Sequence, residues 1–308
     1  MEAHRVLLSA LPPVRWAAAY GSAVFAQPRA GAAKMVDYLL AVDDTRAWHA
    51  ANLRRNASHY AGAPRVLGGG AAAALAERIG AGVHFNTAVP FAGGVVKYGV
   101  VATSRLREDL ERWCDLYAAG RLQKPTLALR GGEDGRLCAA RWANERAALA
   151  AALLLLPRRG ASEREMLEAI VGLSYGGDVR MAVGAEAEGK VGAIAEGSRE
   201  PMREMYAPHL AALQEAGLLS LTADAEAEDA CGVERDVSVA AEAALAAQLP
   251  PSFKRSFAEG GAGALRDALA ATVRASSARA AVAGVCTAGL AKGSAYVMAK
   301  LKKGILKP

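Results

Sequence analysis

The sequence predicts an α+β protein of about two domains, rich in helix and with a modest sheet. The chain has 308 residues, which is enough for two domains of roughly 100–200 residues each. Hydrophobic residues make up 53% of it, but many of them are alanines, which favour helix and bury little area. Short apolar runs that follow glycines supply strand candidates between the helical stretches.

The first part of the chain, residues 1–138, carries the strand signals. An apolar run at 16–20 ends in a Gly-Ser turn, and the run at 35–42 is apolar enough to form a buried strand. Further strands are expected at 83–85 and 95–101, each after glycines. A helix is expected to begin near Asp44. We therefore expect this part to form an α/β unit.

Helices dominate the second part, residues 139–222. An Ala/Leu-rich helix is expected from Arg141 to Leu156, where Pro157 stops it. Ser162 and Glu165 have the spacing of a capping box, which predicts a second helix to about Leu173. Two helices followed by an apolar run at 179–183 fit a small helical or winged-helix domain.

The last part, residues 223–308, begins with an acidic stretch at 223–236, which we expect to be an exposed loop. Beyond Leu265 the sequence returns to Ala-rich helix. Residues 265–308 hold eight basic side chains and one acid, so the formal net charge of +6 belongs to this tail. A nearly neutral body argues against a surface that coats nucleic acid, whereas a basic tail fits an anionic membrane.

The tail itself has an amphipathic pattern. Tyr296, Val297, Leu301 and Ile305 form an apolar helical stripe, with four lysines largely around its other side: Lys300, Lys302, Lys303 and Lys307. Such a helix can rest in a membrane interface. The alternative is a helix that packs on the protein's own core and leaves its lysines in solvent.

Several features exclude whole classes of protein. The longest apolar runs, such as 147–156, are too short for a transmembrane helix, which needs about 20 apolar residues. The four cysteines form no CxxC pair, so neither a zinc site nor a disulfide framework is indicated. A folded-domain pattern begins almost at once, so we expect no Arg- and Ser-rich transit segment in this sequence.

The sharpest chemical feature is a Gly21-Ser22 turn followed by Asp37 inside an apolar strand. A buried carboxylate without a partner is costly, and Mg²⁺ is one such partner. A Gly-Ser turn can contact a triphosphate whose oxygens share the metal. Two observations support the opposing interpretation. Gly-Ser occurs three times in the chain, so the pair alone says little, and a strand aspartate such as Asp37 can simply cap a neighbouring element. A second strand carboxylate two residues on is missing, since that position is Leu39.

Six runs of residues keep one order along the chain: Tyr-Gly-Ser-Ala-Val-Phe-Ala-Gln at 20–27, Met-Val-Asp-Tyr-Leu-Leu-Ala-Val at 35–42, the His- and Asn-containing stretch at 48–60, Lys-Tyr-Gly-Val at 97–100, Gly-Arg-Leu-Gln-Lys-Pro at 120–125 and Leu-Ser-Tyr-Gly-Gly-Asp-Val-Arg-Met at 173–181. Together they resemble the mitochondrial phosphatidate cytidylyltransferases, also called the translocator assembly and maintenance family. The resemblance runs from residue 5 to about 210 and is weakest in the acidic stretch.

The resemblance implies a polymerase-β-like nucleotidyltransferase domain at 1–138 and a winged-helix or helical domain at 139–222 that completes the active-site cleft. It implies a membrane-associating C-terminal region at 223–308. The activity implied is Mg²⁺-dependent transfer of CMP from CTP to phosphatidic acid, which gives CDP-diacylglycerol and pyrophosphate and feeds cardiolipin synthesis. The implied location is peripheral, on the matrix side of the mitochondrial inner membrane. The oligomeric state stays open.

The resemblance also implies roles for individual residues. Asp37 would bind Mg²⁺, and Tyr20, Gly21 and Ser22 would hold the nucleotide phosphates. Asp178 would supply the missing carboxylate, and Arg180 would grip a phosphate through two hydrogen bonds. The alternative for this last pair is a local ion pair after a Gly-Gly turn.

Three further positions are candidates. Lys97 lies on an apolar strand and is expected to contact a phosphate, although a lysine at a strand end can also extend to solvent. His49 and Asn52, three residues apart, share one helix face and are assigned to the nucleotide cleft, although a solvated face would have the same pattern. Lys124 is expected in a domain-joining loop that touches the lipid phosphate. The other histidines His4, His84 and His209 are expected to be structural.

Two other functions remain open. The polymerase-β fold hosts many chemistries, so another nucleotidyltransferase with a different nucleotide or acceptor is one alternative. The second is a non-catalytic membrane scaffold that supports mitochondrial protein import. The length of the resemblance and the basic tail weigh against the first, and the retention of Ser22, Asp37 and Asp178 weighs against the second.

Overall fold

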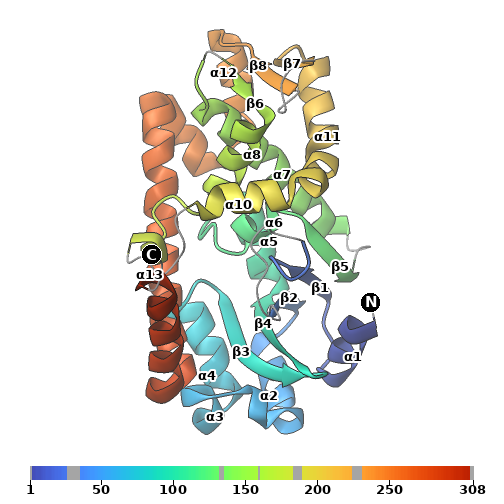
Figure 1. Ribbon diagram of the computed structural model, residues 1–308, viewed down its shortest axis with the longest axis vertical. Coiled ribbons are helices and arrows are strands. Elements are labelled where there is room, and N and C mark those ends of the chain that lie inside the picture. Colours follow the sequence, from blue (N-terminus) through green and yellow to red (C-terminus); the bar gives the residue numbers. More distant parts are fainter. Residues whose placement is uncertain are drawn as a thin grey trace.

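A computed structural model describes residues 2–25, 35–131, 135–158, 160–182, 189–223 and 231–305. It contains a region built on a mixed sheet, a second region that is mostly helical, and a long helix, α13, that runs beside both (Figure 1). The predicted class, a helix-rich protein with a modest sheet, is confirmed at this level.

The larger sheet has five strands in the order β3-β4-β2-β1-β5. Strand β2 runs parallel to β4, whereas the other neighbouring pairs of this sheet are antiparallel. The expected strands at 16–20 and 35–42 are present, and those at 83–85 and 95–101 extend further than expected. The strands are β1 (Trp16–Tyr20), β2 (Val36–Val42), β3 (Val83–Phe91), β4 (Gly94–Ala102) and β5 (Thr126–Arg130).

Different helices cover the two faces of this sheet. Side chains alternate along a strand, so Leu39 and Ala41 of β2 belong to one hydrophobic core and Leu40 and Val42 to another. The first face packs on α5 (Thr103–Arg112) and α7 (Gly135–Leu155), and the second on α1 (Glu2–Ala10) and α2 (Thr45–Arg55). The remaining elements of this region are η1 (Ala57–His59), α3 (Gly62–Leu67), α4 (Gly69–Ala74), η2 (Leu75–Ile79) and α6 (Ala119–Leu122).

The second region surrounds α7, whose residues 147–154 are all buried. The predicted capping box is confirmed: Ser162 Oγ accepts a hydrogen bond from the Glu165 backbone, and the Glu165 carboxylate accepts one from Ser162 N. A small sheet has the order β6-β8-β7. The elements are β6 (Ala161–Ser162), α8 (Glu163–Gly172), α9 (Val179–Ala182), α10 (Lys190–Gly197), α11 (Arg199–Glu215), β7 (Leu219–Ala223), β8 (Cys231–Arg235) and α12 (Val239–Ala246).

One expectation for this region needs correction. The acidic stretch is not all loop: residues 224–230 lie outside the described ranges, but Cys231–Arg235 form β8, which pairs antiparallel with β7. Val233 is buried, so this strand has an inward face despite its acidic surroundings. The apolar run at 179–183 forms the short helix α9 over its described residues.

Helix α13 (Pro251–Ile305) begins well before the predicted start at Leu265. It buries Phe253, Leu265, Leu269 and Val273 in the first core. The side chains of the predicted membrane-binding lysines, Lys300, Lys302, Lys303 and Lys307, lie outside the described residues. Over the described ranges, no helix has the length and apolar character needed to cross a membrane.

Candidate active site

Three strands bring one side chain each to the same place. Backbone pairing sets Tyr20 of β1 opposite Asp37 of β2, and Asp37 opposite Lys97 of β4. Asp37 alternates in phase with Leu39, so it projects from the sheet face that α5 and α7 cover. Lys97 Nζ lies 3.2 Å from Asp37 Oδ1, which is an ion-pair distance. The sheet thus brings together three of the residues that the sequence assigned to the site.

Lys97 keeps its positive charge at neutral pH. Burial on its own lowers the pKa of a lysine, but Tyr20 and the Asp37 carboxylate outweigh burial and raise the pKa of Lys97 above its ordinary value. Its Nζ also lies 4.4 Å from the centre of the Phe85 ring, within cation–π distance. Lys97 therefore presents a fixed cation beside Asp37.

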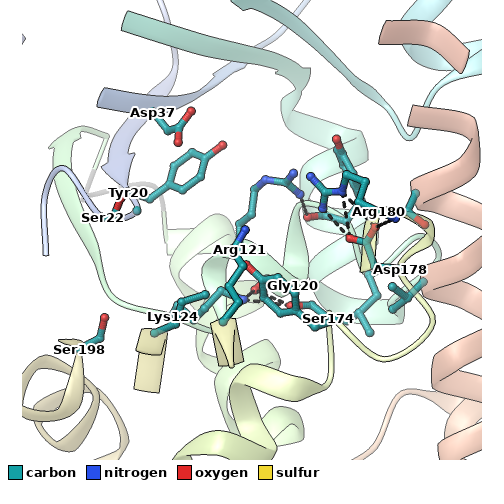
Figure 2. A pocket seen from close by; sticks show the side chains of 18 of the residues that line it. Tyr20, Ser22, Asp37, Gly120, Arg121, Lys124, Ser174, Asp178, Arg180 and Ser198 are labelled. Carbon is teal, nitrogen blue, oxygen red and sulfur yellow. Dashed lines mark hydrogen bonds and ion pairs between the residues drawn. The ribbon is translucent and has the colours of Figure 1, made fainter. Parts of the chain in front are cut away.

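The turn after β1 lies directly beside this ion pair. Gly21 has φ of 85°, a conformation that residues with a side chain rarely adopt. A Cβ added there would lie 3.5 Å from Asp37 Oδ2. The Gly21 carbonyl accepts hydrogen bonds from the backbones of Val24 and Phe25 at 3.0 and 3.1 Å. The turn holds Ser22 at the cavity next to Tyr20 (Figure 2).

A buried carboxylate organises the next part of the wall. Asp109 of α5 accepts hydrogen bonds from the backbone N–H groups of residues 115–119, at 2.8–3.2 Å. In this loop Trp113 and Leu116 have φ of 52° and 48°, in the left-handed region that ordinary residues avoid. The contacts of Asp109 stabilise this strained path, which leads into α6.

Helix α6 carries Arg121 into the cavity. The guanidinium carbon of Arg121 lies 4.0 Å from the centre of the Tyr117 ring, and the guanidinium donates to the Tyr117 carbonyl. Its side chain extends between Tyr20 and Arg180 (Figure 2). An arginine held in this way is a rigid donor for phosphate oxygens.

Lys124, just after α6, joins the two regions of the protein. It donates to the Gly120 carbonyl and, at 3.0 Å, to Ser174 Oγ from the segment between α8 and α9. Gly120 allows this approach, because a Cβ there would lie 2.3 Å from Ser174 Cβ. Burial, together with the charges of Arg121 and Lys190, lowers the pKa of Lys124 to about 7. An anion bound nearby would favour the charged amine.

Asp178 also faces the cavity, but Arg180 holds its carboxylate. Arg180 Nε lies 3.0 and 3.2 Å from the two Asp178 oxygens, and Asp178 is only 3% exposed. The preceding Gly177, with φ of 86°, packs against helix α13: a Cβ there would lie 2.3 Å from the Ala270 carbonyl oxygen. The local ion pair, which was the alternative to a metal ligand, is therefore present, and a metal role for Asp178 stays a prediction.

These elements enclose a cavity of about 290 Å³ between the sheet and the helical region. Helix α10 adds Lys190, and α13 adds Val273, Ser276 and Ser277. The charged side chains that line the cavity include more cations than carboxylates: Lys97, Arg121, Lys124, Arg180 and Lys190 against Asp37 and Asp178. Such an excess of positive charge suits a ligand with several phosphate groups.

His49 and Asn52 do not reach this cavity, which corrects the expectation that they line a nucleotide cleft. Both are 0% exposed, because α2 packs on the opposite face of the sheet. His49 Nδ1 lies 2.8 Å from the Tyr60 hydroxyl, and Asn52 donates to the Tyr98 hydroxyl at 2.9 Å. Their shared helix face points into the protein and forms a buried hydrogen-bond network.

Several residues of the cavity wall were not predicted from the sequence. Arg121 had a usable signal, because it lies within the run at 120–125 that carries the resemblance. Ser174, Lys190 and Ser198 come from separate elements of the helical region. Ser174 lies within the run at 173–181, which also carries the resemblance, but Lys190 and Ser198 lie in none of these runs and only tertiary packing brings them to the cavity.

The residues present fit a magnesium ion that is shared with phosphate oxygens. Asp37 Oδ1 is buried and accepts no hydrogen bond, since the Lys97 contact lacks hydrogen-bond geometry, so it keeps a lone pair for a cation. Across the described ranges, no group of three or more His, Cys, Asp or Glu side chains is placed to hold a metal alone. Mg²⁺ is often bound by one or two carboxylates together with substrate phosphates and water, which is the arrangement this site permits.

The fold places a cation-rich cavity, suited to phosphorylated ligands, between a mixed sheet and a helical region. A family model described as "Phosphatidate cytidylyltransferase, mitochondrial" matches residues 4–264. The protein of that name from Bos taurus is 36% identical over 98% of this chain and 94% of its own length. Those from Xenopus laevis and Homo sapiens are 42% and 40% identical over 66% of this chain, and the matches cover 61% and 45% of their lengths. This chain belongs to the mitochondrial phosphatidate cytidylyltransferase family.

Proposed function

We propose that this protein transfers CMP from CTP to phosphatidic acid, releasing pyrophosphate and giving CDP-diacylglycerol, a precursor for cardiolipin. The observation that carries the proposal is the cavity beside Asp37, in which five cationic side chains converge in a chain of this family. Both substrates and both products are phosphate esters or anhydrides, so one cation-rich cavity can serve the whole reaction.

The chemistry needs little proton transfer. An ionised phosphate oxygen of phosphatidic acid attacks the α-phosphorus of CTP, and the bond from that phosphorus to the β-phosphate oxygen breaks. Catalysis of such a step depends on positioning and on neutralising charge. Lys97, which lies beside Asp37, and Arg121 both line the cavity and can neutralise the reacting phosphates.

The cavity offers two groups of phosphate contacts. One lies on the sheet and comprises Gly21, Ser22, Asp37 and Lys97; we assign it to the triphosphate. The other joins Arg121, Lys124 and Lys190 with Ser174, at the junction with the helical region. We assign this second group to the phosphate of the lipid.

Asp37 is the side chain that we propose as the magnesium ligand. The ion, when bound, would neutralise triphosphate oxygens and stabilise charge that develops on the leaving pyrophosphate. The buried Asp37 Oδ1, which accepts no hydrogen bond, supports this assignment. Asp178 is a weaker candidate, because Arg180 already engages both of its oxygens.

We further propose that the five-stranded sheet with its covering helices is a polymerase-β-like nucleotidyltransferase domain, near 1–138, and that residues near 139–222 form a winged-helix domain. The mixed sheet with a Gly-Ser turn after β1 supports the first assignment. Helices α8 and α11, which contact the small sheet, and α10, which packs on α8, support the second. We place the protein peripherally on the matrix side of the inner membrane, with residues 223–308 supplying the membrane contact.

One experiment separates this function from its alternatives. Purified protein is incubated with Mg²⁺, liposomes that contain phosphatidic acid, and each nucleoside triphosphate in turn. We expect a liponucleotide with CTP alone. A nucleotidylated product that forms only with another triphosphate or acceptor would favour a different nucleotidyltransferase. A folded protein that gives no product with any triphosphate would favour the non-catalytic scaffold.

A further inference from the structure

Helix α13 touches the cavity wall that carries Asp178. Ser277 Oγ of α13 accepts a hydrogen bond from Val179 N at 3.1 Å, and Gly177 packs against the Ala270 carbonyl. Ser277 and its neighbour Ser276 also line the cavity themselves. This part of α13 therefore helps to shape one side of the site.

The same stretch of α13 also contacts the loop between α5 and α6 through Arg279. Its guanidinium pairs with one carboxylate oxygen of Asp115, and Arg105 of α5 pairs with the other. Asp115 is 2% exposed, and its backbone N–H donates to Asp109. Losing one partner would leave this buried carboxylate only partly compensated, which is costly.

Asp115 lies in the strained loop that leads to Arg121. The loop has left-handed backbone at Trp113 and Leu116, and such conformations persist only where surrounding contacts hold them. Tyr117, two residues beyond Asp115, contacts Arg121 through both its ring and its carbonyl. A shift of the loop at Asp115 would therefore move Arg121.

We infer that Arg279 and Asp115 form a clamp by which helix α13 positions Arg121 for the reaction. The inference rests on the proposed function, because it assigns a role in that same site. Asp115 and Arg279 are positioning residues: their contacts lead to Arg121, and neither lines the cavity among the described residues. The clamp makes the C-terminal helix part of the catalytic apparatus as well as part of the core.

Arg279 is suited to positioning rather than to global stability. Its side chain is 48% exposed, and the core contacts of α13 come from its buried apolar residues. Arg105 remains as a partner of Asp115 when Arg279 is removed. We therefore expect an Arg279 variant to fold and to lose activity through the loop.

The test compares four forms of the full-length protein with CTP, Mg²⁺ and a water-soluble short-chain phosphatidic acid. Arg279→Ala is expected to lower kcat/KM about tenfold, less than the roughly hundredfold loss that a misplacement of about 1 Å can cause, because Arg105 still holds Asp115. Arg279→Lys keeps a cation and is expected to recover most of that loss. Arg274→Ala is the matched control, because Arg274 is exposed on the same helix and forms no ion pair among the described residues.

The decisive measurement repeats Arg279→Ala in an Arg121→Ala background. If the clamp acts through Arg121, Arg279→Ala causes no further loss there, a non-additivity expected of coupled residues. Equal losses in both backgrounds, or a loss as large in Arg274→Ala, would overturn the inference. Calorimetric titration with the short-chain phosphatidic acid, whose phosphate we assign to Arg121, gives a readout that needs no turnover: the affinity should fall on Arg279→Ala only while Arg121 is present. An inactive wild-type protein would refute the proposed function, and this titration would still decide the clamp.

Discussion

At the scale of single residues, the sheet pairs charges that neither strand could bury alone. Asp37 and Lys97 are opposite each other in register, and their side chains are 27% and 20% exposed. An isolated carboxylate in this position would be costly. The ion pair with Lys97 reduces the cost of burying the Asp37 carboxylate. It leaves Asp37 Oδ1 without a hydrogen bond, so this oxygen can still bind a metal cation.

The two candidate metal carboxylates are expected to respond differently to removal of their charge. Asp37→Asn keeps the side-chain shape but should reduce activity at least about a hundredfold and raise the Mg²⁺ concentration needed for half-maximal rate. Asp178→Asn should lower the rate through loss of the Arg180 pair, with an unchanged Mg²⁺ requirement. Rates measured over a Mg²⁺ titration check both. Wild-type turnover in Asp37→Asn, or a raised requirement only in Asp178→Asn, would reverse the assignment.

Lys124 is expected to make phosphate binding dependent on pH. Its pKa of about 7 in the free protein means that the amine is charged below pH 7 and increasingly neutral above it. The charged form binds an anion better, so KM for phosphatidic acid should rise as pH increases from 7 to 9. Lys124→Arg stays charged over this range and should show a flatter profile. Parallel profiles for the two proteins would show that Lys124 is not the titrating group.

At the scale of elements, helix α2 shows how a sequence pattern can be correct while its interpretation is wrong. His49 and Asn52 do share a face, as their spacing predicts, but that face contacts Tyr60 and Tyr98 on the far side of the sheet. His84 of β3 stacks on Tyr60, with ring planes 21° apart. This cluster of polar residues is a buried network that ties α2 to β3 and β4.

The buried histidines are expected to make the protein sensitive to acid. Burial lowers the pKa of His84 to about 4, whereas an exposed histidine in the unfolded chain titrates near 6.5. Between these values the unfolded chain binds more protons, so stability falls as pH decreases from 6.5 to 4, by up to about 3 kcal/mol for His84. Urea unfolding of wild type and His84→Phe at several pH values measures this loss. The same pH dependence in both proteins would contradict it.

Local patterns predicted those elements whose signal lies within their own residues. The buried strand at 35–42, the helix that ends near Pro157 and the capping box at Ser162 are of this kind. Strand β8 was not predicted, because it forms by pairing with β7 and its own residues give only a weak strand signal. The residues that connect the two strands lie outside the described ranges. Helix α9 was missed because four residues give too short a pattern to distinguish helix from strand.

The residues of the candidate site also fall into two groups, those with a local sequence signal and those that only tertiary contacts bring together. Tyr20, Asp37 and Lys97 were found because each lies in a recognisable run and the sheet register brings them together. The contact of Lys124 with Ser174 joins residues 50 apart in sequence. Packing of Gly120 on Ser174 creates that contact, and nothing in the sequence around either residue predicts that the two meet. The sheet half of the cavity was therefore predictable. In the helical half, the run at 173–181 marked Asp178 and Arg180, whereas Lys190, Ser198 and the serines of α13 were not predicted.

At the scale of the whole molecule, helix α13 connects the cavity with the basic C-terminal tail. Deletion of residues 292–308 is expected to abolish sedimentation with liposomes of phosphatidic acid, because each lysine near an anionic surface contributes about 1 kcal/mol. Binding of CTP and Mg²⁺ by the remaining chain should change little, since every described residue that lines the cavity precedes the deletion. A truncated protein that still sediments fully would place the membrane contact on another surface.

The central claim, that this cavity transfers CMP from CTP to phosphatidic acid, is tested most directly by following the two ends of CTP separately. Purified protein is given liposomal phosphatidic acid, Mg²⁺ and CTP radiolabelled on either the α- or the γ-phosphate. We predict that the α-label enters the lipid fraction as CDP-diacylglycerol, that the γ-label leaves as pyrophosphate, and that Asp37→Asn stops both. A γ-label in the lipid, or α-label transfer that persists in Asp37→Asn, would contradict this account of the site.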